Sequence, residues 1–244
     1  MSKEVYQDDI IVLQVKDWQT ADKFAVCFSR NHGKVSFVAY GARYGRSNGG
    51  RLVQPFAALS VKLLRGKRFD TLQQCELNEV PATMDIETLA YAAVIGEVIG
   101  QLTEEYEEQE AIFILLEQAL KILPVRNKRI IVVSTLCKLL TICGFSPQLK
   151  NCTSCGREVV SDAYFSVVQG GIVCDSCMVS SELPFADTTR HLMSELLKLD
   201  FNEPPALIVK GADLMQLEQT LYKFLIYQTS KPLRSLKFLK LMGL

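Results

Sequence analysis

Two CxxC motifs constrain the fold of this chain more than any other feature of its sequence. They are Cys152–Cys155 and Cys174–Cys177. Two thiolates separated by two residues can bind one zinc ion from a single tight turn, and two such turns complete a tetrahedral four-sulfur site. The segment between the motifs has β-rich runs on either side of Gly170-Gly171. The pattern predicts a zinc ribbon over residues 149–180 that holds one structural Zn²⁺ per chain through Cys152, Cys155, Cys174 and Cys177.

The role of this metal follows from the number of its protein ligands. Four sulfurs leave no open coordination position, so we expect a structural rather than a hydrolytic site. The alternative is a redox motif or unliganded thiols, but a thioredoxin-type CxxC needs a βαβ context that the two motifs lack. The other four cysteines lie in apolar stretches, and we expect them to be small buried residues. They are Cys27, Cys75, Cys137 and Cys143.

The first 80 residues have the pattern of a β domain. Short runs of β-branched, aromatic and aliphatic residues alternate with Gly, Asn and Asp. The predicted strands are Ile10–Val15, Phe24–Phe28, Val35–Tyr40, Phe56–Leu63 and Thr71–Leu77. Five short strands without a helical segment fit a small closed barrel, which leaves no exposed strand edge. We therefore predict an OB-fold over residues 1–80.

After Pro81 the apolar residues recur at spacings of three and four, which is typical of amphipathic helices. This spacing predicts helical structure between Ile86 and Leu123, with Pro124 as its end. Further helices are predicted at Ile130–Cys143, Thr188–Leu199, Leu214–Gln228 and Leu233–Leu241. The expected fold class is α+β and multidomain: a barrel, then a helical domain in two parts (81–148 and 181–244) with the zinc ribbon inserted between them.

The net charge is zero, but the charges are unevenly distributed. Nine acidic residues and no Lys or Arg lie between Asp85 and Glu117. The segment from Arg30 to Arg68 has no Asp or Glu. Its nine basic residues are the candidate DNA-binding residues: Arg30, Lys34, Arg43, Arg46, Arg51, Lys62, Arg65, Lys67 and Arg68. Such a biased stretch indicates a surface that binds polyanionic strands.

Aromatic residues lie among these cations, and two roles are open for them. They are Phe37, Tyr40, Tyr44, Phe56 and Phe69. Aromatic rings can stack on nucleobases. Phenylalanines in strands more often face inward, so the barrel core is the favoured interpretation.

The glycine-rich segment Gly41–Ser47 does not match a phosphate-binding Walker motif. Three residues separate its glycines where the motif needs four, and Arg46 occupies the lysine position. A loop with Arg43, Arg46 and Arg51 is better suited to a nucleic-acid backbone. The two histidines, His32 and His191, do not form a catalytic group with other residues of the pattern. We therefore expect no enzyme activity and no small-molecule substrate.

The apolar runs, the N-terminal residues and the C-terminal cations bear on the compartment and on further partners. The longest apolar runs, Ala111–Leu116 and Ile130–Val133, are too short for a membrane span of roughly 20 residues. The N-terminal residues have no signal-peptide pattern, so a cytoplasmic location is expected. Residues 231–240 alternate cations with an apolar helical stripe. This stripe either faces a core, borders a pocket for an acidic and apolar peptide, or contacts DNA.

Several motifs together resemble the bacterial RecO family of recombination mediators. The barrel segment contributes Asp9–Leu13, Gly41-Ala42-Arg43 and Gln54-Pro55-Phe56. The most specific part is the junction Gly144–Leu149, which leads into the cysteine motifs. Tyr222, Lys231-Pro232-Leu233 and Ser235 extend the resemblance over nearly the whole chain. The family often has Lys-Ser where this chain has Arg46-Ser47, a difference that keeps the charge.

The resemblance implies more than the spacing does. RecO-like proteins bind single- and double-stranded DNA, anneal complementary strands and associate with RecR. With RecR they help load RecA onto DNA coated by single-strand-binding protein, whose acidic C-terminal tail they contact. Candidate residues for that tail are Arg234, Lys237 and Phe238. The resemblance also implies association with the nucleoid. The alternatives are a zinc-ribbon nucleic-acid-binding enzyme, such as a nuclease or a thiol oxidoreductase, and a transcription-type interaction scaffold.

Overall fold

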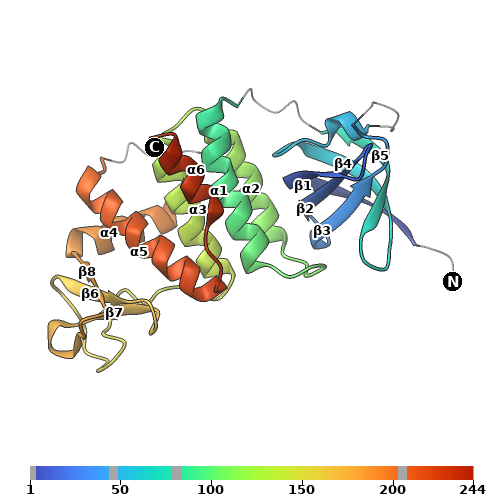
Figure 1. Ribbon diagram of the computed structural model, residues 1–244. Coiled ribbons are helices and arrows are strands. Elements are labelled where there is room, and N and C mark those ends of the chain that lie inside the picture. The colour runs from blue at the N-terminus through green and yellow to red at the C-terminus, as the bar shows by residue number, and fades with distance from the viewer. Residues whose placement is uncertain (1–3, 44–48, 79–83, 203–207, 244) are drawn as a thin grey trace. The chain divides into compact units, whose positions relative to one another are not determined.

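Five strands close into a barrel near the N-terminus (Figure 1). The structure is a computed structural model that describes residues 4–43, 49–78, 84–202 and 208–243. The barrel strands are β1 (Val5–Trp18), β2 (Asp22–Ser29), β3 (Gly33–Ala39), β4 (Ala58–Leu64) and β5 (Asp70–Leu77). A short 3-10 helix, η1 (Gly50–Leu52), precedes β4. The strand order β1-β2-β3-β5-β4, closed by pairing of β1 with β4, confirms the predicted OB-like barrel.

The long strand β1 makes closure of the barrel possible. Its N-terminal part pairs with β4 and its C-terminal part with β2, and a register shift between Val12 and Gln14 bends it. Strand β3 pairs with β5 in parallel. Phe37 and Leu59 are fully buried in the barrel core, and Phe56 is also buried. The core interpretation is thus confirmed for Phe37 and Phe56.

Two helices pack on the outside of the barrel. They are α1 (Ile86–Leu102) and α2 (Glu110–Ile122), where the sequence pattern indicated helical structure. Ile11 and Phe28 alternate with core residues along their strands, yet both are buried. Gly96 allows α1 to come close, because a Cβ there would lie 3.2 Å from the Phe56 ring. The helices therefore cover an apolar wall of the barrel.

The remaining helices and strands belong to the C-terminal part of the chain. The helices are α3 (Lys128–Ile142), α4 (Asp187–Lys198), α5 (Gly211–Thr229) and α6 (Arg234–Leu241), as the apolar spacing predicted. The strands β6 (Ala163–Ser166), β7 (Gly171–Val173) and β8 (Leu183–Phe185) form a sheet in the order β7-β6-β8. Phe165 and Phe185 from the sheet contact each other, and Phe165 also contacts Phe224 of α5. These buried rings anchor the sheet to the helices.

The contacts between residues divide the chain into two compact units, residues 1–124 and 125–244. The first contains the barrel with α1 and α2, and the second contains all later elements. The domain boundaries expected after residues 80, 148 and 180 stay predictions. Among the helices of the described residues, none combines the length and apolar character that crossing a bilayer requires.

Candidate metal centre and nucleic-acid interface

The four predicted zinc ligands come together at one point of the second unit. The Sγ atoms of Cys152, Cys155, Cys174 and Cys177 all lie within 4.8 Å of one another. The distance between Cys155 Sγ and Cys174 Sγ is 3.9 Å. A tetrahedral zinc ion with Zn–S bonds of about 2.3 Å separates its sulfurs by about 3.8 Å. The four cysteines can therefore hold one metal ion.

Each CxxC motif forms a tight turn. In the first, Gly156 N donates to Cys152 O at 2.9 Å. Gly156 has a φ of +75°, a conformation that favours glycine, so its place directly after the motif has a steric reason. The second motif forms a 3-10 turn, η2 (Asp175–Cys177), in which Cys177 N donates to Cys174 O at 2.9 Å. The two turns direct four sulfurs to one position.

Two hydrogen bonds to the cysteine sulfurs come from a backbone amide and from an arginine side chain. Cys174 N donates to Cys152 Sγ at 3.4 Å, which links the second motif to the first. Arg157 Nε donates to Cys155 Sγ at 3.4 Å, and this contact lowers the pKa of the Cys155 thiol to about 6. A cation beside the sulfurs favours the thiolate form that binds metal. The sequence pattern missed Arg157, although it lies only two residues after Cys155.

The other cysteines lie apart from this site. Cys27 and Cys137 are fully buried, and Cys75 is buried at the edge of the barrel core. Burial raises the pKa of the Cys75 thiol to about 11 and that of Cys137 to about 12. These three residues are small core residues, as expected. Cys143 is only partly buried.

Lys34, Arg30 and Arg65, three of the candidate DNA-binding cations, are only partly exposed and contact protein groups of the first unit. Lys34 Nζ donates to the carbonyl oxygens of Gly100, at 3.0 Å, and of Thr103. These carbonyls lie at the C-terminus of α1, where a cation is favoured by the helix dipole. The side chain of Lys34 therefore joins the hairpin between β2 and β3 to α1.

Arg30 and Arg65 also contact protein groups. Arg30 Nη1 lies 3.2 Å from Glu110 Oε1, and its guanidinium lies 4.4 Å from the centre of the Phe113 ring. Arg65 lies over two rings, 4.6 Å from Tyr6 and 4.3 Å from Tyr106. Cation–π contacts of this kind are stabilising when they are partly desolvated. Both guanidinium groups therefore already interact with protein groups, which makes them less available to a phosphate.

Four other candidate cations are exposed on the barrel unit. They are Arg43, Arg51, Lys67 and Arg68. Lys67 and Arg68 lie in the turn between β4 and β5. Arg43 lies against the turn between β1 and β2, where it donates to Thr20 O at 3.3 Å and pairs with Asp17 at 3.4 Å. Arg46 and Tyr44 lie outside the described residues.

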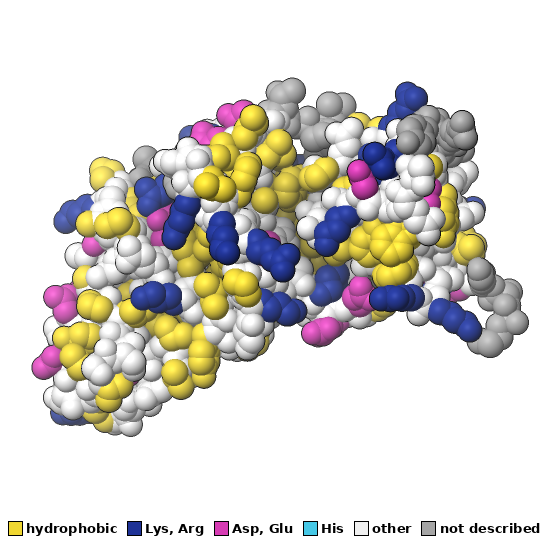
Figure 2. All heavy atoms as spheres, viewed as in Figure 1, with side chains coloured by type: hydrophobic (Ala, Val, Ile, Leu, Met, Phe, Trp, Pro, Cys, Tyr) yellow, Lys and Arg dark blue, Asp and Glu magenta, His cyan; other side chains and the backbone are white. Residues whose placement is uncertain are grey.

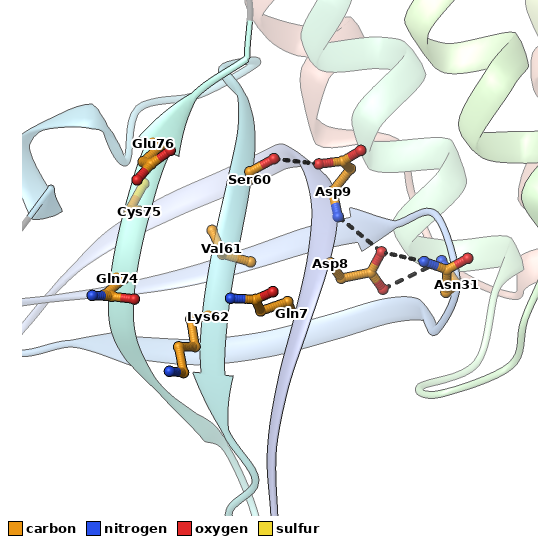
Figure 3. A pocket seen from close by; sticks show the side chains of 10 residues that line it. All are labelled: Gln7, Asp8, Asp9, Asn31, Ser60, Val61, Lys62, Gln74, Cys75 and Glu76. Carbon is orange, nitrogen blue, oxygen red and sulfur yellow. Dashed lines mark hydrogen bonds between the residues drawn. The ribbon is translucent and has the colours of Figure 1, made fainter.

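A hollow of about 380 Å³ lies on the side of the barrel formed by β1, β4 and β5 (Figure 3). Ten residues line it: Gln7, Asp8, Asp9, Asn31, Ser60, Val61, Lys62, Gln74, Cys75 and Glu76. A hydrogen bond from Ser60 stabilises the carboxylate of Asp9 and lowers its pKa. Asp8 accepts from Asn31 Nδ2 at 2.8 Å. The carboxylates give this hollow an acidic lining, in which Lys62 is the one Lys or Arg among the described lining residues.

Three aromatic residues contact one another where β1, β2 and the β4–β5 turn meet. The ring centres of Trp18 and Phe24 are 5.4 Å apart, and those of Phe24 and Phe69 are 4.9 Å apart. Trp18 and Phe69 complete the aromatic cluster at 5.8 Å. The sequence pattern pointed to Phe69 but not to Trp18 or Phe24, because these two precede the acid-free segment.

The candidate tail-binding residues lie on α6. Leu239 faces inward, whereas Arg234, Lys237 and Phe238 are exposed, Phe238 to 47%. The buried and exposed positions along α6 match the amphipathic pattern of its sequence. The helix thus presents two cations and an aromatic ring to solvent.

Comparisons with known proteins match both parts of the chain. The family model "Recombination protein O N terminal" matches residues 1–80, and "Recombination protein O C terminal" matches residues 84–237. A DNA repair protein RecO from Desulforamulus reducens is 32% identical over 241 residues, covering 97% of this chain and 94% of the relative. Relatives with the same name from Symbiobacterium thermophilum and Pelotomaculum thermopropionicum are 31% and 30% identical. They cover 96% and 98% of this chain, and 96% and 95% of their own lengths.

Proposed function

The chain belongs to the RecO family of DNA repair proteins, and from this premise we propose that it is a DNA-binding recombination mediator. In this proposal it binds single- and double-stranded DNA and anneals complementary strands. Together with RecR it helps load RecA onto DNA that is coated by single-strand-binding protein. The barrel is the part that binds the strands, and the zinc ribbon maintains the shape of its own part of the chain.

The observation that carries the proposal is the exposure of cations from an acid-free segment on an OB-like barrel. Lys67 and Arg68 in the β4–β5 turn and Arg43 beside the β1–β2 turn are exposed. Ligands of OB-folds bind on the face bordered by these two loops. Phosphate contacts of Lys and Arg give binding that is indifferent to base sequence and dependent on salt.

The acidic groups support the same placement of the DNA. Asp9 and Glu76 line the hollow on the side of β1, β4 and β5 (Figure 3), and carboxylates there would repel phosphates. Lys34, Arg30 and Arg65 are engaged by α1, α2 and aromatic rings. We therefore propose Arg43, Arg51, Lys67 and Arg68 as the main DNA contacts among the described residues, with Lys62 contributing less.

We also propose that this function involves no catalysis. A general base needs a free nitrogen or carboxylate aimed at a substrate. His32 Nδ1 lies 2.6 Å from the buried carboxylate of Asp8, and its ring packs against Tyr6 with centres 4.5 Å apart. His191 is an exposed residue of α4. The same Asp8 carboxylate accepts from Asn31 Nδ2. His32 N donates to Ser29 Oγ at 3.0 Å, so the contacts of His32 hold the β2–β3 turn together.

The salt dependence of DNA binding tests this proposal. We expect labelled oligothymidylate to bind with log affinity falling against log salt at a slope of about −3.5, which corresponds to about five neutralised phosphates at −0.7 each. We also expect faster annealing of complementary oligonucleotides without any nucleotide cofactor. Fluorescence anisotropy measures the first and a quenched-pair annealing assay the second. A flat salt dependence with no annealing would contradict the proposal.

For the metal we propose zinc. Four sulfur ligands in a closed tetrahedral arrangement are typical of structural zinc sites. The distances among the Sγ atoms of Cys152, Cys155, Cys174 and Cys177 support this ligand set. Bound zinc would supply folding energy to a segment whose strands β6, β7 and β8 have only three or four residues each.

For the partner we propose that α6 contributes to the site of an acidic peptide tail. An acidic peptide that ends in an aromatic residue and a carboxylate complements two cations beside an exposed ring. On α6 these are Arg234, Lys237 and Phe238. The proposed tail is that of single-strand-binding protein.

Charge reversal on α6 tests the tail site. We expect the double substitution Arg234→Glu and Lys237→Glu to weaken binding of a labelled tail peptide by about tenfold or more, because like charges then face each other. Anisotropy with the peptide measures this effect. The matched control is Lys150→Glu with Lys198→Glu, which makes the same charge change on other exposed residues. Unchanged affinity in a folded α6 variant would exclude these residues from the tail site.

A further inference from the structure

The aromatic cluster of Trp18, Phe24 and Phe69 lies on the outside of the barrel. Along β2, Phe24 alternates with Ala25 and Cys27, and those two residues belong to the barrel core. Phe24 is paired directly with the exposed Lys16 of β1. Paired residues of antiparallel strands point to the same side of the sheet. The Phe24 ring and the two rings that contact it therefore lie on the outer face.

The three rings are only partly buried. Large aromatic residues are generally buried in the interior, so a group of partly exposed rings on the outside of a barrel requires an explanation. The rings meet at different angles: Phe69 stands nearly perpendicular to Phe24, at 77°, and Trp18 is tilted by 33° from Phe24. The cluster is therefore a stepped surface and not a single stack.

Cations surround the cluster. Lys16 lies opposite Phe24 in the strand register, and the Arg68 guanidinium lies 5.1 Å from the centre of the Phe69 ring. Lys67 is the exposed neighbour of Arg68. On the barrel face seen in Figure 2, dark blue Lys and Arg side chains and some magenta Asp and Glu side chains lie beside yellow apolar side chains. An apolar surface with a rim of cations is complementary to a ligand with flat apolar rings and phosphates.

Nearby acidic groups are engaged by other parts of the barrel. Asp17 pairs with Arg43 at 3.4 Å. The buried Asp22 accepts from Gly41 N at 2.9 Å, and the buried Asp70 accepts from Gly66 N at 3.0 Å. These three carboxylates are thus partly compensated by local partners and repel a phosphate less. A phosphate beside the rings would therefore interact mainly with Lys and Arg.

We infer that Trp18, Phe24 and Phe69 form a stacking surface for the bases of an unpaired DNA strand, while Lys16, Lys67 and Arg68 contact its phosphates. This inference rests on the proposed DNA binding and adds to it the mode of recognition. In a duplex the faces of the bases are covered by their neighbours, whereas an unpaired strand can turn them toward aromatic rings. The aromatic cluster therefore favours single strands over duplexes, and the cations serve both.

Trp18 makes a direct test feasible because it is the only tryptophan of the chain. A base that stacks on or beside the indole changes its emission. We expect oligothymidylate to cause a saturable loss of tryptophan fluorescence in the full-length protein, with the same midpoint as anisotropy of the labelled strand. A duplex of equal length should bind with little change in emission. Binding by anisotropy with constant emission for both ligands would overturn the inference and leave the proposed DNA binding intact.

Substitution of the neighbouring rings provides the second test. The variants Phe69→Leu and Phe24→Leu keep apolar bulk and remove the π face. We expect each to weaken binding of oligothymidylate by about tenfold, as removal of a base-stacking ring does elsewhere. Duplex affinity and the salt slope should stay near those of the unchanged protein, because no cation is removed. Tyr227→Leu, which removes an exposed ring on α5, is the matched control.

The outcomes of these measurements are distinct. Loss of thermal stability in Phe69→Leu with unchanged affinity for single strands would show a purely structural cluster and overturn the inference. Equal weakening for single strands and duplexes would overturn it as well, because stacking requires unpaired bases. If the unchanged protein binds neither ligand, the proposed function fails together with the inference. If one variant does not fold, the other variant and the emission of the unchanged protein still decide.

Discussion

Replacing Cys152 and Cys174 together with serine is expected to abolish zinc binding and to unfold the segment around β6, β7 and η2. One ligand is removed from each CxxC turn, so neither remaining pair can complete a tetrahedral site. Structural zinc contributes on the order of 10 kcal/mol to the folding of such segments. The short strands β6 and β7 cannot replace that contribution by packing. We expect about one zinc per chain in the unchanged protein and almost none in the variant.

Metal analysis and hydrogen exchange check this prediction. Amide protection should be lost over residues 149–180 in the double variant and also after treatment of the unchanged protein with a strong chelator. Cys143→Ser is the matched control, since it removes a partly buried thiol outside the cluster. Because the barrel belongs to the other compact unit, its DNA affinity should persist. A variant that keeps its metal, or loses it without any change in protection, would contradict the assigned structural role.

Neutralising Arg43, Lys67 and Arg68 together with alanine should reduce affinity for single-stranded DNA by about 100-fold at 0.1 M salt. Each lost phosphate contact removes about 0.7 from the slope of log affinity against log salt, so three contacts flatten it by about 2. All three residues are exposed and the contacts of Arg43 with Asp17 and of Arg68 with Phe69 lie at the surface, so their loss should change the thermal stability of the barrel little. Anisotropy titrations at four or more salt concentrations measure slope and affinity together.

The control for this variant must change the net charge equally. Lys121→Ala, Lys150→Ala and Lys198→Ala remove three cations that make ion pairs elsewhere on the surface. If both triple variants lose affinity to the same extent, the effect is one of overall charge and the barrel has no special role. Lys34, Arg30 and Arg65 would be poor substitutes, because their removal also breaks contacts with α1, α2 and aromatic rings.

Much of the fold could be predicted from the sequence because it depends on local patterns. Alternation, glycine punctuation and the spacing of three and four located the barrel strands and the helices. The strand β8 (Leu183–Phe185) was missed, since three residues are too few to show a period. The clustering of Cys152, Cys155, Cys174 and Cys177 could also be predicted, because the CxxC spacing already implies a common turn geometry.

The candidate DNA surface was harder to predict, because it depends on contacts between distant residues. In the sequence, Lys34 and Lys67 are equivalent members of the basic segment. In the structure, Lys34 Nζ donates to the carbonyl oxygens of Gly100 and Thr103, whereas Lys67 is exposed. Trp18, Phe24 and Phe69 are brought together only by barrel closure. A linear sequence shows which side chains carry charge or rings, but the folded backbone decides which of them share a face.

The contact between Lys34 and the end of α1 has a consequence for how the first unit can be divided. At the neighbouring Gly33, a Cβ would lie only 1.8 Å from the carbonyl oxygen of Glu107, so the hairpin tip is fitted closely against the segment between α1 and α2. A fragment that stops at residue 80 would lose this support and uncover Ile11 and Phe28 to water. The smallest autonomous piece that carries the barrel therefore has to extend through α2, to about residue 124.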